Sequence, residues 1–134
     1  MNAVDTSVVV AAFASWHEGH TAAREALSGA PRLPAHVALE AYSVLTRLPP
    51  PHRAPADIVV TFLESRFPEP PLTLPAADHV GLLRDVSARG ITGGALYDAL
   101  IAATARHAGA TLLTRDRRAT RIYESFGVDF RFVV

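Results

Sequence analysis

The pattern of apolar and polar residues along this chain predicts short buried strands that alternate with amphipathic helices. Met1 to Val4 has the character of an apolar strand, and residues 128–134 alternate with a period of two, as an edge strand does. Further strands are predicted at 33–35, 72–74 and 111–114, and helices at 8–14, 16–27, 37–48, 56–67, 76–89, 95–105 and 117–126. This order favours an α/β domain with helices on both faces of a central, mostly parallel sheet of four to five strands.

Proline and glycine mark where several of these elements end. Pro49-Pro50-Pro51 ends one helix but is too short to be an interdomain linker, and Gly109 stands where a C-cap glycine would end the helix that begins at 95. A length of 134 residues is enough for one core and too short for two ordinary domains. We therefore expect residues 1–134 to form a single domain.

The amino-acid composition excludes several classes of protein. The chain is 49% hydrophobic and 19% charged, which indicates a folded domain, and it has no cysteine for disulfides or thiolate metal sites. Its apolar runs are far shorter than the roughly 20 residues of a membrane span, so we expect a soluble, cytoplasmic protein that does not bind membranes. The formal net charge is zero, so any binding of nucleic acid must depend on a local patch.

Two acids lie where ligand chemistry is common in α/β folds. Asp98 falls in the first turn of the Ala-rich helix, and the residues three and four positions away offer no side chain that pairs with it. Asp116 falls just past the carboxyl end of the strand 111–114, at the edge of the sheet where open α/β folds place their ligands.

Two further acids belong to the same edge. Asp5 follows the first strand, although the triplet Asp5-Thr6-Ser7 alone is explained as simply by a helix N-cap. Glu40 lies beside the apolar stripe of the helix 37–48, as either a boundary residue or a deliberately buried acid. The chain has no lysine to neutralise such a cluster, so its natural occupant is a hard divalent cation, Mg²⁺ or Mn²⁺. That arrangement suits attack of water on a phosphodiester.

These residues carry a family resemblance. The chain resembles PIN-domain ribonucleases in its four acidic motifs, which are Asp5-Thr6-Ser7, Glu40, the run from Tyr97-Asp98 to Ala105, and Leu113-Thr114-Arg115-Asp116. More narrowly, from residue 2 to the last strand, it is similar to the VapC toxins of bacterial toxin–antitoxin pairs. The run after Asp98, together with Thr114 and Asp116, is the more specific part of the match.

The resemblance implies a PIN-like three-layer α/β/α sandwich and an endoribonuclease that depends on Mg²⁺ or Mn²⁺. Its acidic site would be Asp5, Glu40, Asp98 and Asp116; Asp5, Asp98 and Asp116 would hold the metal, with the hydroxyls of Thr6 and Thr114 behind them. The resemblance also implies a homodimer, inhibition by a small VapB-like antitoxin, and structured RNA such as transfer RNA as substrate. Trp16 and Tyr42 are candidates for the antitoxin surface, although core packing suits at least one of them.

Arginines flank the acidic motifs. The candidates for contact with the RNA backbone are Arg115, Arg117, Arg118 and Arg121. A solvated helix face explains them equally well, and Arg117 and Arg118 stand where several relatives carry a further acid, which leaves the number of metal ions open. No aromatic pair in the sequence identifies a platform for stacking bases.

Three alternatives to a nuclease compete for the same acids. A receiver-like signalling domain also binds Mg²⁺ at this edge, but it relies on a lysine that the chain lacks. A haloacid-dehalogenase-like phosphatase needs an Asp-x-Asp pair where Asp5-Thr6-Ser7 stands. A catalytically silent interaction domain would leave the electrostatic repulsion among four acids unexplained.

Overall fold

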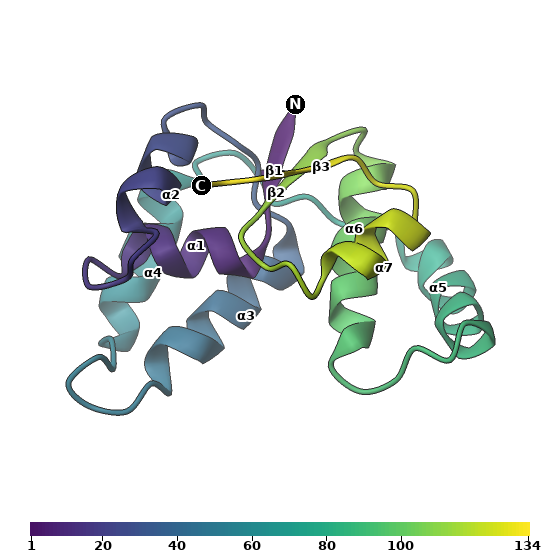
Figure 1. Ribbon diagram of the computed structural model, residues 1–134, viewed down its shortest axis with the longest axis horizontal. Coiled ribbons are helices and arrows are strands. Elements are labelled where there is room, and N and C mark those ends of the chain that lie inside the picture. Colours follow the sequence, from purple (N-terminus) through teal and green to yellow (C-terminus); the bar gives the residue numbers. More distant parts are fainter.

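Three short parallel strands lie at the centre of the computed structural model, which describes residues 1–134 (Figure 1). They are β1 (Asn2–Val4), β2 (Thr111–Thr114) and β3 (Phe130–Phe132), in the order β1-β2-β3. Val4 pairs with Leu113, and Thr114 pairs with Phe132. Because the strands are parallel and in this register, the residues that follow β1 and β2 emerge at one edge of the sheet.

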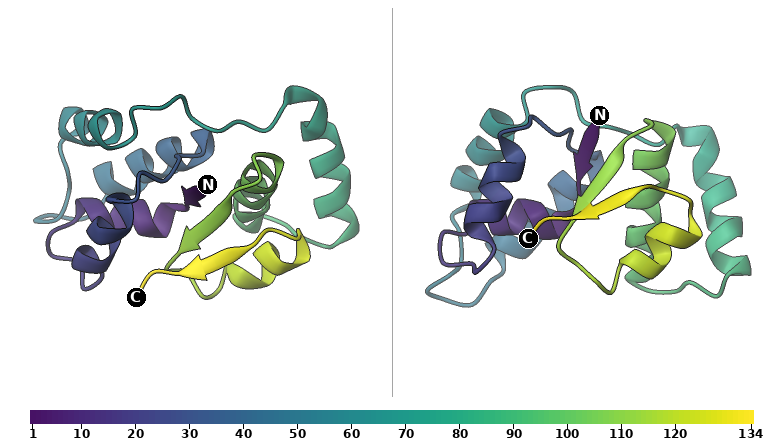
Figure 2. Two further views of the ribbon diagram at one scale, coloured as in Figure 1. Left: turned by 90° about the horizontal axis from the view of Figure 1, so that it is seen from above. Right: turned by 45° about the horizontal axis from the view of Figure 1, so that its top comes forward.

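Seven helices flank this sheet. They are α1 (Thr6–Phe13), α2 (His20–Leu27), α3 (Ala35–Thr46), α4 (Ala56–Arg66), α5 (Ala76–Ala88), α6 (Ala95–His107) and α7 (Thr120–Ser125). Figure 1 shows α1 to α4 on one flank and α5 to α7 on the other, and the views in Figure 2 agree. Helices α1 and α6 each contact β2 and also contact α3 and α7, respectively. The predicted α/β architecture is confirmed.

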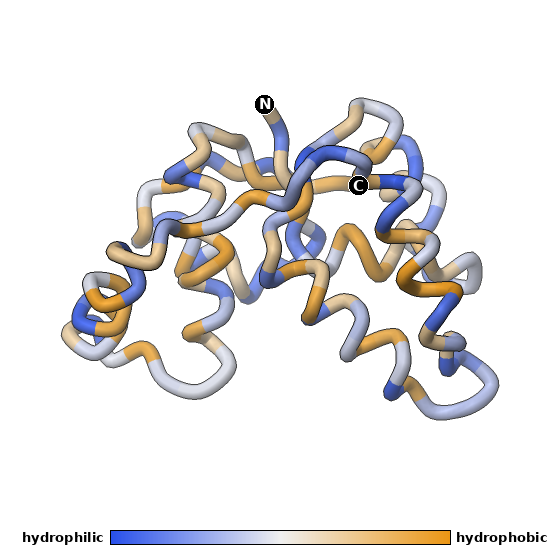
Figure 3. The backbone as a smooth tube through the Cα atoms, turned by 180° about the vertical axis from the view of Figure 1, so that it is seen from behind, coloured by the Kyte–Doolittle hydropathy of each residue, from blue (hydrophilic) through white to orange (hydrophobic).

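The core lies where the strands meet α1 and α6. Val4, Leu112, Leu113 and Ile101 are each at most 2% exposed, and Figure 3 shows apolar segments running through this central region. Burying such side chains contributes about 1.5–3 kcal/mol each. This rigid centre fixes the ends of β1 and β2, from which the polar residues of the edge project.

The predicted number of strands is wrong, because two of the expected strands are only single bridges. Arg32 bridges Ala3, and Pro34 bridges Leu72, both in parallel orientation. Pro34 has no N–H to donate to a strand ladder, and α3 begins at the next residue. Strand pairing therefore ends at Pro34. The segments near 33 and 72 therefore continue the order of the sheet without adding full strands to it.

Two helices begin later than the sequence predicts. Helix α2 begins at His20 rather than Trp16, since the Gly19 N–H donates to Nδ1 of His17 in a turn. Helix α7 begins at Thr120 rather than 117, because the side chain of Asp116 accepts from the Arg118 N–H in a similar turn. At the end of α6, Gly109 has φ +69°, as predicted for the residue that stops the helix.

None of these helices is both long enough and apolar enough to cross a membrane.

Candidate active site

The four predicted acids line one small cavity at the edge of the sheet where β1 and β2 end. The cavity has a volume of about 30 Å³ and is lined by Asp5, Thr6, Ser7, Glu40, Asp98, Ile101, Asp116 and Tyr123. Asp5 caps α1, Glu40 projects from α3, Asp98 lies in the first turn of α6, and Asp116 follows β2. The structure thus brings together all four acids that the sequence singled out.

Asp5 is the most deeply held of these acids, at 2% exposure. Its Oδ1 accepts hydrogen bonds from Ser7 Oγ at 2.5 Å and from the Val8 N–H at 3.3 Å, and its Oδ2 accepts from the Tyr123 hydroxyl at 2.9 Å. Burial raises the pKa of Asp5, while the hydroxyls of Ser7, Thr114 and Tyr123 act in the opposite direction by stabilising the carboxylate. Asp5 is therefore both a helix cap and a residue of the cavity, and the two interpretations of its triplet are compatible.

Tyr123 is a site residue that the sequence analysis missed. It is 1% exposed, and burial together with the negative charge of Asp5 raises the pKa of its hydroxyl far above the ordinary value. The neutral hydroxyl is thus a permanent hydrogen-bond donor to Asp5. A tyrosine on the apolar face of a predicted helix needs a partner for its hydroxyl, but nothing in the sequence says that the partner lies at the other end of the chain.

Asp98 also lies in surroundings that disfavour a charged carboxylate. Burial raises its pKa to about 6, with further contributions from the charges of Asp116, Glu40 and Asp5 and a smaller opposing one from Arg118. An upward pKa shift with these causes is expected where several carboxylates share one site without a neutralising cation.

Asp116 is held by the turn that leads from β2 to α7. Its N–H donates to the Thr114 hydroxyl at 3.0 Å, and its Oδ1 accepts from the Arg118 N–H at 2.9 Å. The Arg118 guanidinium also approaches Oδ1 at 3.6 Å, but this side chain is 94% exposed, so the ion pair contributes little stability. Thr114 is completely buried and links Asp5 to the Asp116 turn.

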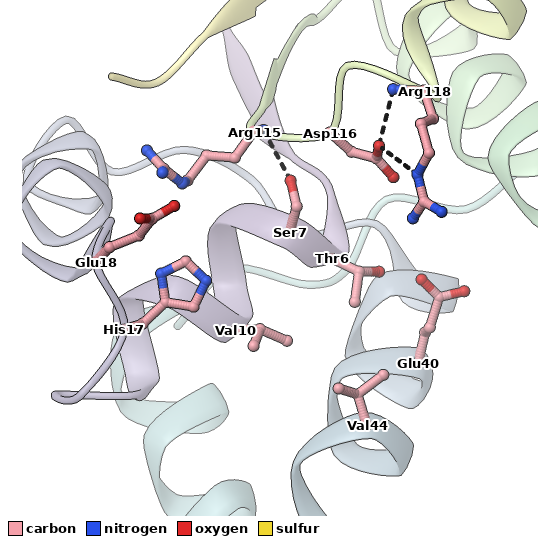
Figure 4. Close-up of a pocket in the computed structure, with 10 residues that line it drawn as sticks. All are labelled: Thr6, Ser7, Val10, His17, Glu18, Glu40, Val44, Arg115, Asp116 and Arg118. Atoms are coloured by element: carbon pink, nitrogen blue, oxygen red, sulfur yellow. Dashed lines mark hydrogen bonds and ion pairs between the residues drawn. The ribbon is translucent and has the colours of Figure 1, made fainter. Parts of the chain in front are cut away.

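Glu40 lies at the mouth of the cavity. Its Oε2 is 3.2 Å from Nε2 of His36, one turn earlier on α3, and its side chain is 31% exposed. Figure 4 shows Glu40 reaching from α3 toward Asp116 and Arg118. Glu40 is therefore a boundary residue that also faces the other acids, which combines the two alternatives left open by its sequence position.

Thr6 and Ser7 place hydroxyls between the acids. The buried Oγ1 of Thr6 has no hydrogen-bond partner in the chain, although Thr6 lines the cavity. Ser7 donates to Asp5 and accepts from the Arg115 N–H at 2.8 Å, so it ties α1 to the segment after β2. The unpaired hydroxyl of Thr6 is available to a ligand in the cavity.

The acid cavity opens beside a larger one of about 450 Å³ (Figure 4). Two of the predicted arginines line it. Arg118 is the one paired with Asp116, and Arg115 donates from Nη1 to the Val133 carbonyl at 2.7 Å. Arg117 lies over the ring of Phe132, 4.5 Å from its centroid, and together with Arg118 and Arg121 it lines a neighbouring surface cavity of about 540 Å³. All four arginines thus lie along the β2–α7 side of the site.

The donor set fits a hard divalent cation, although it is not already gathered into a ligand shell. No group of three or more His, Asp or Glu side chains lies close enough to hold an ion by itself. Four carboxylates and one unpaired hydroxyl nevertheless share the cavity. Mg²⁺ typically keeps several waters and takes only one or two carboxylates plus substrate phosphates. The residues present therefore meet its requirements.

Comparison with known proteins places this arrangement in a family. The family model described as "PIN domain" matches residues 3–125. Ribonuclease VapC40 of Mycobacterium tuberculosis is 50% identical over 133 residues, covering 99% of each chain, and Ribonuclease VapC27 of the same species is 43% identical, covering 94% of this chain and 92% of its own. The solved structure titled FitAcB from Neisseria gonorrhoeae superposes with a TM-score of 0.67 at 22% identity, covering 97% of this chain and 96% of its own, which shows a shared fold. This chain therefore belongs to the PIN-domain family, among the VapC-type proteins that its sequence resembles.

Proposed function

We propose that this protein is an endoribonuclease that requires Mg²⁺ or Mn²⁺ and acts as the toxin of a toxin–antitoxin pair. The relatives that match along nearly the whole chain are named ribonucleases. The observation that carries the proposal is the convergence of Asp5, Glu40, Asp98 and Asp116 on one cavity, with no lysine among them. The family match argues against the receiver-like and phosphatase alternatives, and the receiver-like domain also needs a lysine that the chain lacks. A silent interaction domain would have no use for four clustered acids.

In the proposed mechanism, Asp5, Asp98 and Asp116 would hold the metal ion, in part through its bound water molecules. Bound there, the ion would stabilise charge on a phosphodiester oxygen and lower the pKa of a water molecule. Tyr123 and Ser7 orient the Asp5 carboxylate through their hydrogen bonds, which favour its ionised form against the effect of burial. The Thr114 hydroxyl performs the corresponding task for the turn that carries Asp116.

Glu40 has a separate role at the cavity mouth. Its partial exposure and its contact with His36 support a role as the base that orients the attacking water and accepts its proton. The Thr6 hydroxyl, which lacks a partner in the chain, can donate to a phosphate oxygen or to that water. Arg115, Arg117, Arg118 and Arg121 would contact backbone phosphates, since arginine forks match phosphate oxygens.

The test is cleavage of labelled RNA by the purified protein in Mg²⁺, in Mn²⁺ and in EDTA. We expect cleavage only with a divalent ion, and a loss of about a hundredfold or more in Asp98→Asn. Asp78→Asn is a matched control, because Asp78 also lies in the first turn of a helix, α5, but outside the acid cavity. Full activity in EDTA, or equal losses in the two variants, would contradict the proposal.

The remaining parts of the proposal rest on the family resemblance. We propose a cytoplasmic protein of one PIN-like domain that forms a homodimer, is inhibited by a small VapB-like antitoxin, and cleaves structured RNA such as transfer RNA. Sedimentation of the purified protein, with and without its co-expressed neighbour, tests the assembly. Cleavage of total RNA followed by sequencing of the new ends identifies the substrate.

A further inference from the structure

Two aromatic side chains form a stack beside the acid cavity. The rings of His36 and Tyr97 have centroids 4.7 Å apart and are nearly parallel, at 8°. His36 lies in the first turn of α3 and Tyr97 in the first turn of α6, so the stack exists only because these two helices meet at their N-terminal ends. In the sequence the two residues are far apart and give no sign of pairing.

The stack is attached to two of the four acids. Nε2 of His36 is 3.2 Å from the carboxylate of Glu40, and Tyr97 directly precedes Asp98. Glu40 and Asp98 are close enough for the charge of one to raise the pKa of the other. Any group that stacks on these rings is therefore held at a fixed place relative to the acids.

Tyr97 is not a core residue, because it remains 46% exposed while His36 is largely covered. One side of the tyrosine ring is occupied by His36, and much of the remainder is open to solvent. Such an open aromatic surface suits stacking by a further flat ring, which gains area burial together with the favourable geometry of aromatic pairs.

Charge decides which part of a nucleic acid fits there. Next to Glu40 and Asp98 a phosphate is repelled, whereas a neutral base is not. The arginines that suit phosphates lie on the β2–α7 segment, while the aromatic stack lies on α3 and α6. A strand whose cleaved phosphate is held by the proposed divalent ion can thus rest its other phosphates on the arginines and a base on Tyr97.

We propose that the His36–Tyr97 stack is a nucleobase platform, which holds an unpaired base next to the phosphate that is cleaved. This inference rests on the proposed ribonuclease function and specifies its substrate class. A base can stack on Tyr97 only if it is free of its helix, so the substrate is RNA that is single-stranded at the cleavage position, in a loop, a bulge or an end.

A second exposed aromatic pair shows why position matters. The ring of Trp16 lies against that of His52, with centroids 4.1 Å apart and the planes tilted by 33°, and Trp16 is 49% exposed. Neither residue adjoins an acid of the cavity in sequence. The His36–Tyr97 pair alone combines an open ring with a fixed attachment to Glu40 and Asp98.

The first test compares cleavage of single-stranded RNA by Tyr97→Leu, Tyr97→Phe and the unchanged protein. We expect Tyr97→Leu to raise KM about tenfold, because stacking on an aromatic ring contributes roughly that much affinity per base, and Tyr97→Phe to restore it. Leu39→Ala, which removes a more exposed apolar side chain from the same helix as His36, is the control and should leave KM unchanged. If the unchanged protein cleaves RNA and Tyr97→Leu has the same KM, the platform is overturned while the ribonuclease function stands.

The second test measures binding without cleavage, in EDTA. The chain has one tryptophan, Trp16, so the double variant Trp16→Phe, Tyr97→Trp carries its only indole on the platform. Single-stranded RNA should quench this indole, and an abasic strand of the same length should not. Equal quenching by the two strands would overturn the platform. If the unchanged protein neither binds nor cleaves RNA with any divalent ion, the proposed function itself fails.

Discussion

The Tyr123 hydroxyl donates a 2.9 Å hydrogen bond to Oδ2 of Asp5, which joins residues 118 positions apart. Both side chains are almost fully buried, at 1% and 2% exposure. The bond connects α7 to the end of β1 and fixes the direction of a carboxylate that faces the acid cavity. Stability and orientation of the site thus depend on the same contact.

Tyr123→Phe should lower the free energy of unfolding by about 1–3 kcal/mol, because a buried oxygen of Asp5 is left without its hydrogen-bond donor. Chemical denaturation at neutral pH measures the change. Tyr97→Phe is the matched control, since it removes the same hydroxyl from a half-exposed ring. Similar losses in both variants would mean that the Asp5 contact contributes nothing of its own.

Asp98→Asn should make the metal-free protein more stable above pH 6. The pKa of Asp98 is raised from 3.8 to about 6 in the folded protein, so the folded state holds its proton more tightly than the unfolded state does. Stability therefore falls as pH rises from about 4 to 6, and the loss is complete above that window. Asparagine cannot ionise, so Asp98→Asn avoids this loss of stability. We expect the free energy of unfolding to increase by about 1 kcal/mol, once screening by solvent is allowed for.

Thermal unfolding of both proteins in EDTA between pH 4 and 8 measures this difference. Near pH 4 the two melting temperatures should converge, and in saturating Mg²⁺ the order should reverse, because only the native site gains the binding free energy of the ion. A lower melting temperature for Asp98→Asn in EDTA at pH 7 would show that Asp98 is a structural residue.

The losses of cleavage activity caused by substituting the proposed metal-binding acids should not be additive. Asp5→Asn, Asp98→Asn and Asp116→Asn each remove a ligand from one proposed site, so the double variant Asp98→Asn, Asp116→Asn should cleave RNA about as slowly as either single variant. Single-turnover rates at saturating Mn²⁺ provide the comparison. If the two losses multiply, the acids act at separate sites.

Gly19 and Gly81 should respond to alanine in opposite directions. A Cβ at Gly19 would lie 2.3 Å from Cζ of Arg115, whose guanidinium would have to leave the Val133 carbonyl, for a loss of about 1 kcal/mol. At Gly81, inside α5, nothing lies within 4 Å, so alanine should add about 0.5–1 kcal/mol through its helix propensity. Chemical denaturation of both variants provides the measurement. If the Gly19→Ala and Gly81→Ala variants were equally stable, the packing of Arg115 on Gly19 would contribute nothing to stability.

The proposed antitoxin should cover Trp16 and Tyr42. Both are exposed, at 49% and 39%, and aromatic side chains of this kind anchor interfaces. Trp16→Ala should weaken binding of a co-expressed small neighbour about tenfold or more, measured by titration, whereas Leu83→Ala on α5 should not. Absence of any co-purifying protein that suppresses cleavage argues against the toxin role, while full binding by Trp16→Ala argues only against this surface.

The positions of the four acids were predictable because each depends on a local feature. Asp5 and Asp116 follow strands, and Asp98 lies in the first turn of a helix that Gly109 ends. Parallel strands then bring such residues to one edge without any detail of packing. Glu40 is the least local of the four, and its sequence left its orientation open. The catalytic roles of all four stay predictions.

Contacts between distant segments were not predictable. Ser7 meets the N–H of Arg115, 108 positions away, and His36 meets Tyr97, because α1, α3 and α6 pack in one particular way. The strand near Pro34 was expected from its apolar residues, but the missing N–H of proline and the start of α3 left it only a single bridge. Trp16 was expected in a helix, whereas the turn capped by His17 delays that helix to His20.

The order of the strands has a consequence for synthesis of the protein on the ribosome. β1 leaves the ribosome well before its ladder partner β2, which begins only at Thr111. Asp5 is likewise synthesised long before its partners Thr114 and Tyr123, the latter 118 positions later, and Asp116 is the last of the four acids to be translated. A nascent chain released before residue 116 lacks at least one of the four acids, so it cannot carry the complete site.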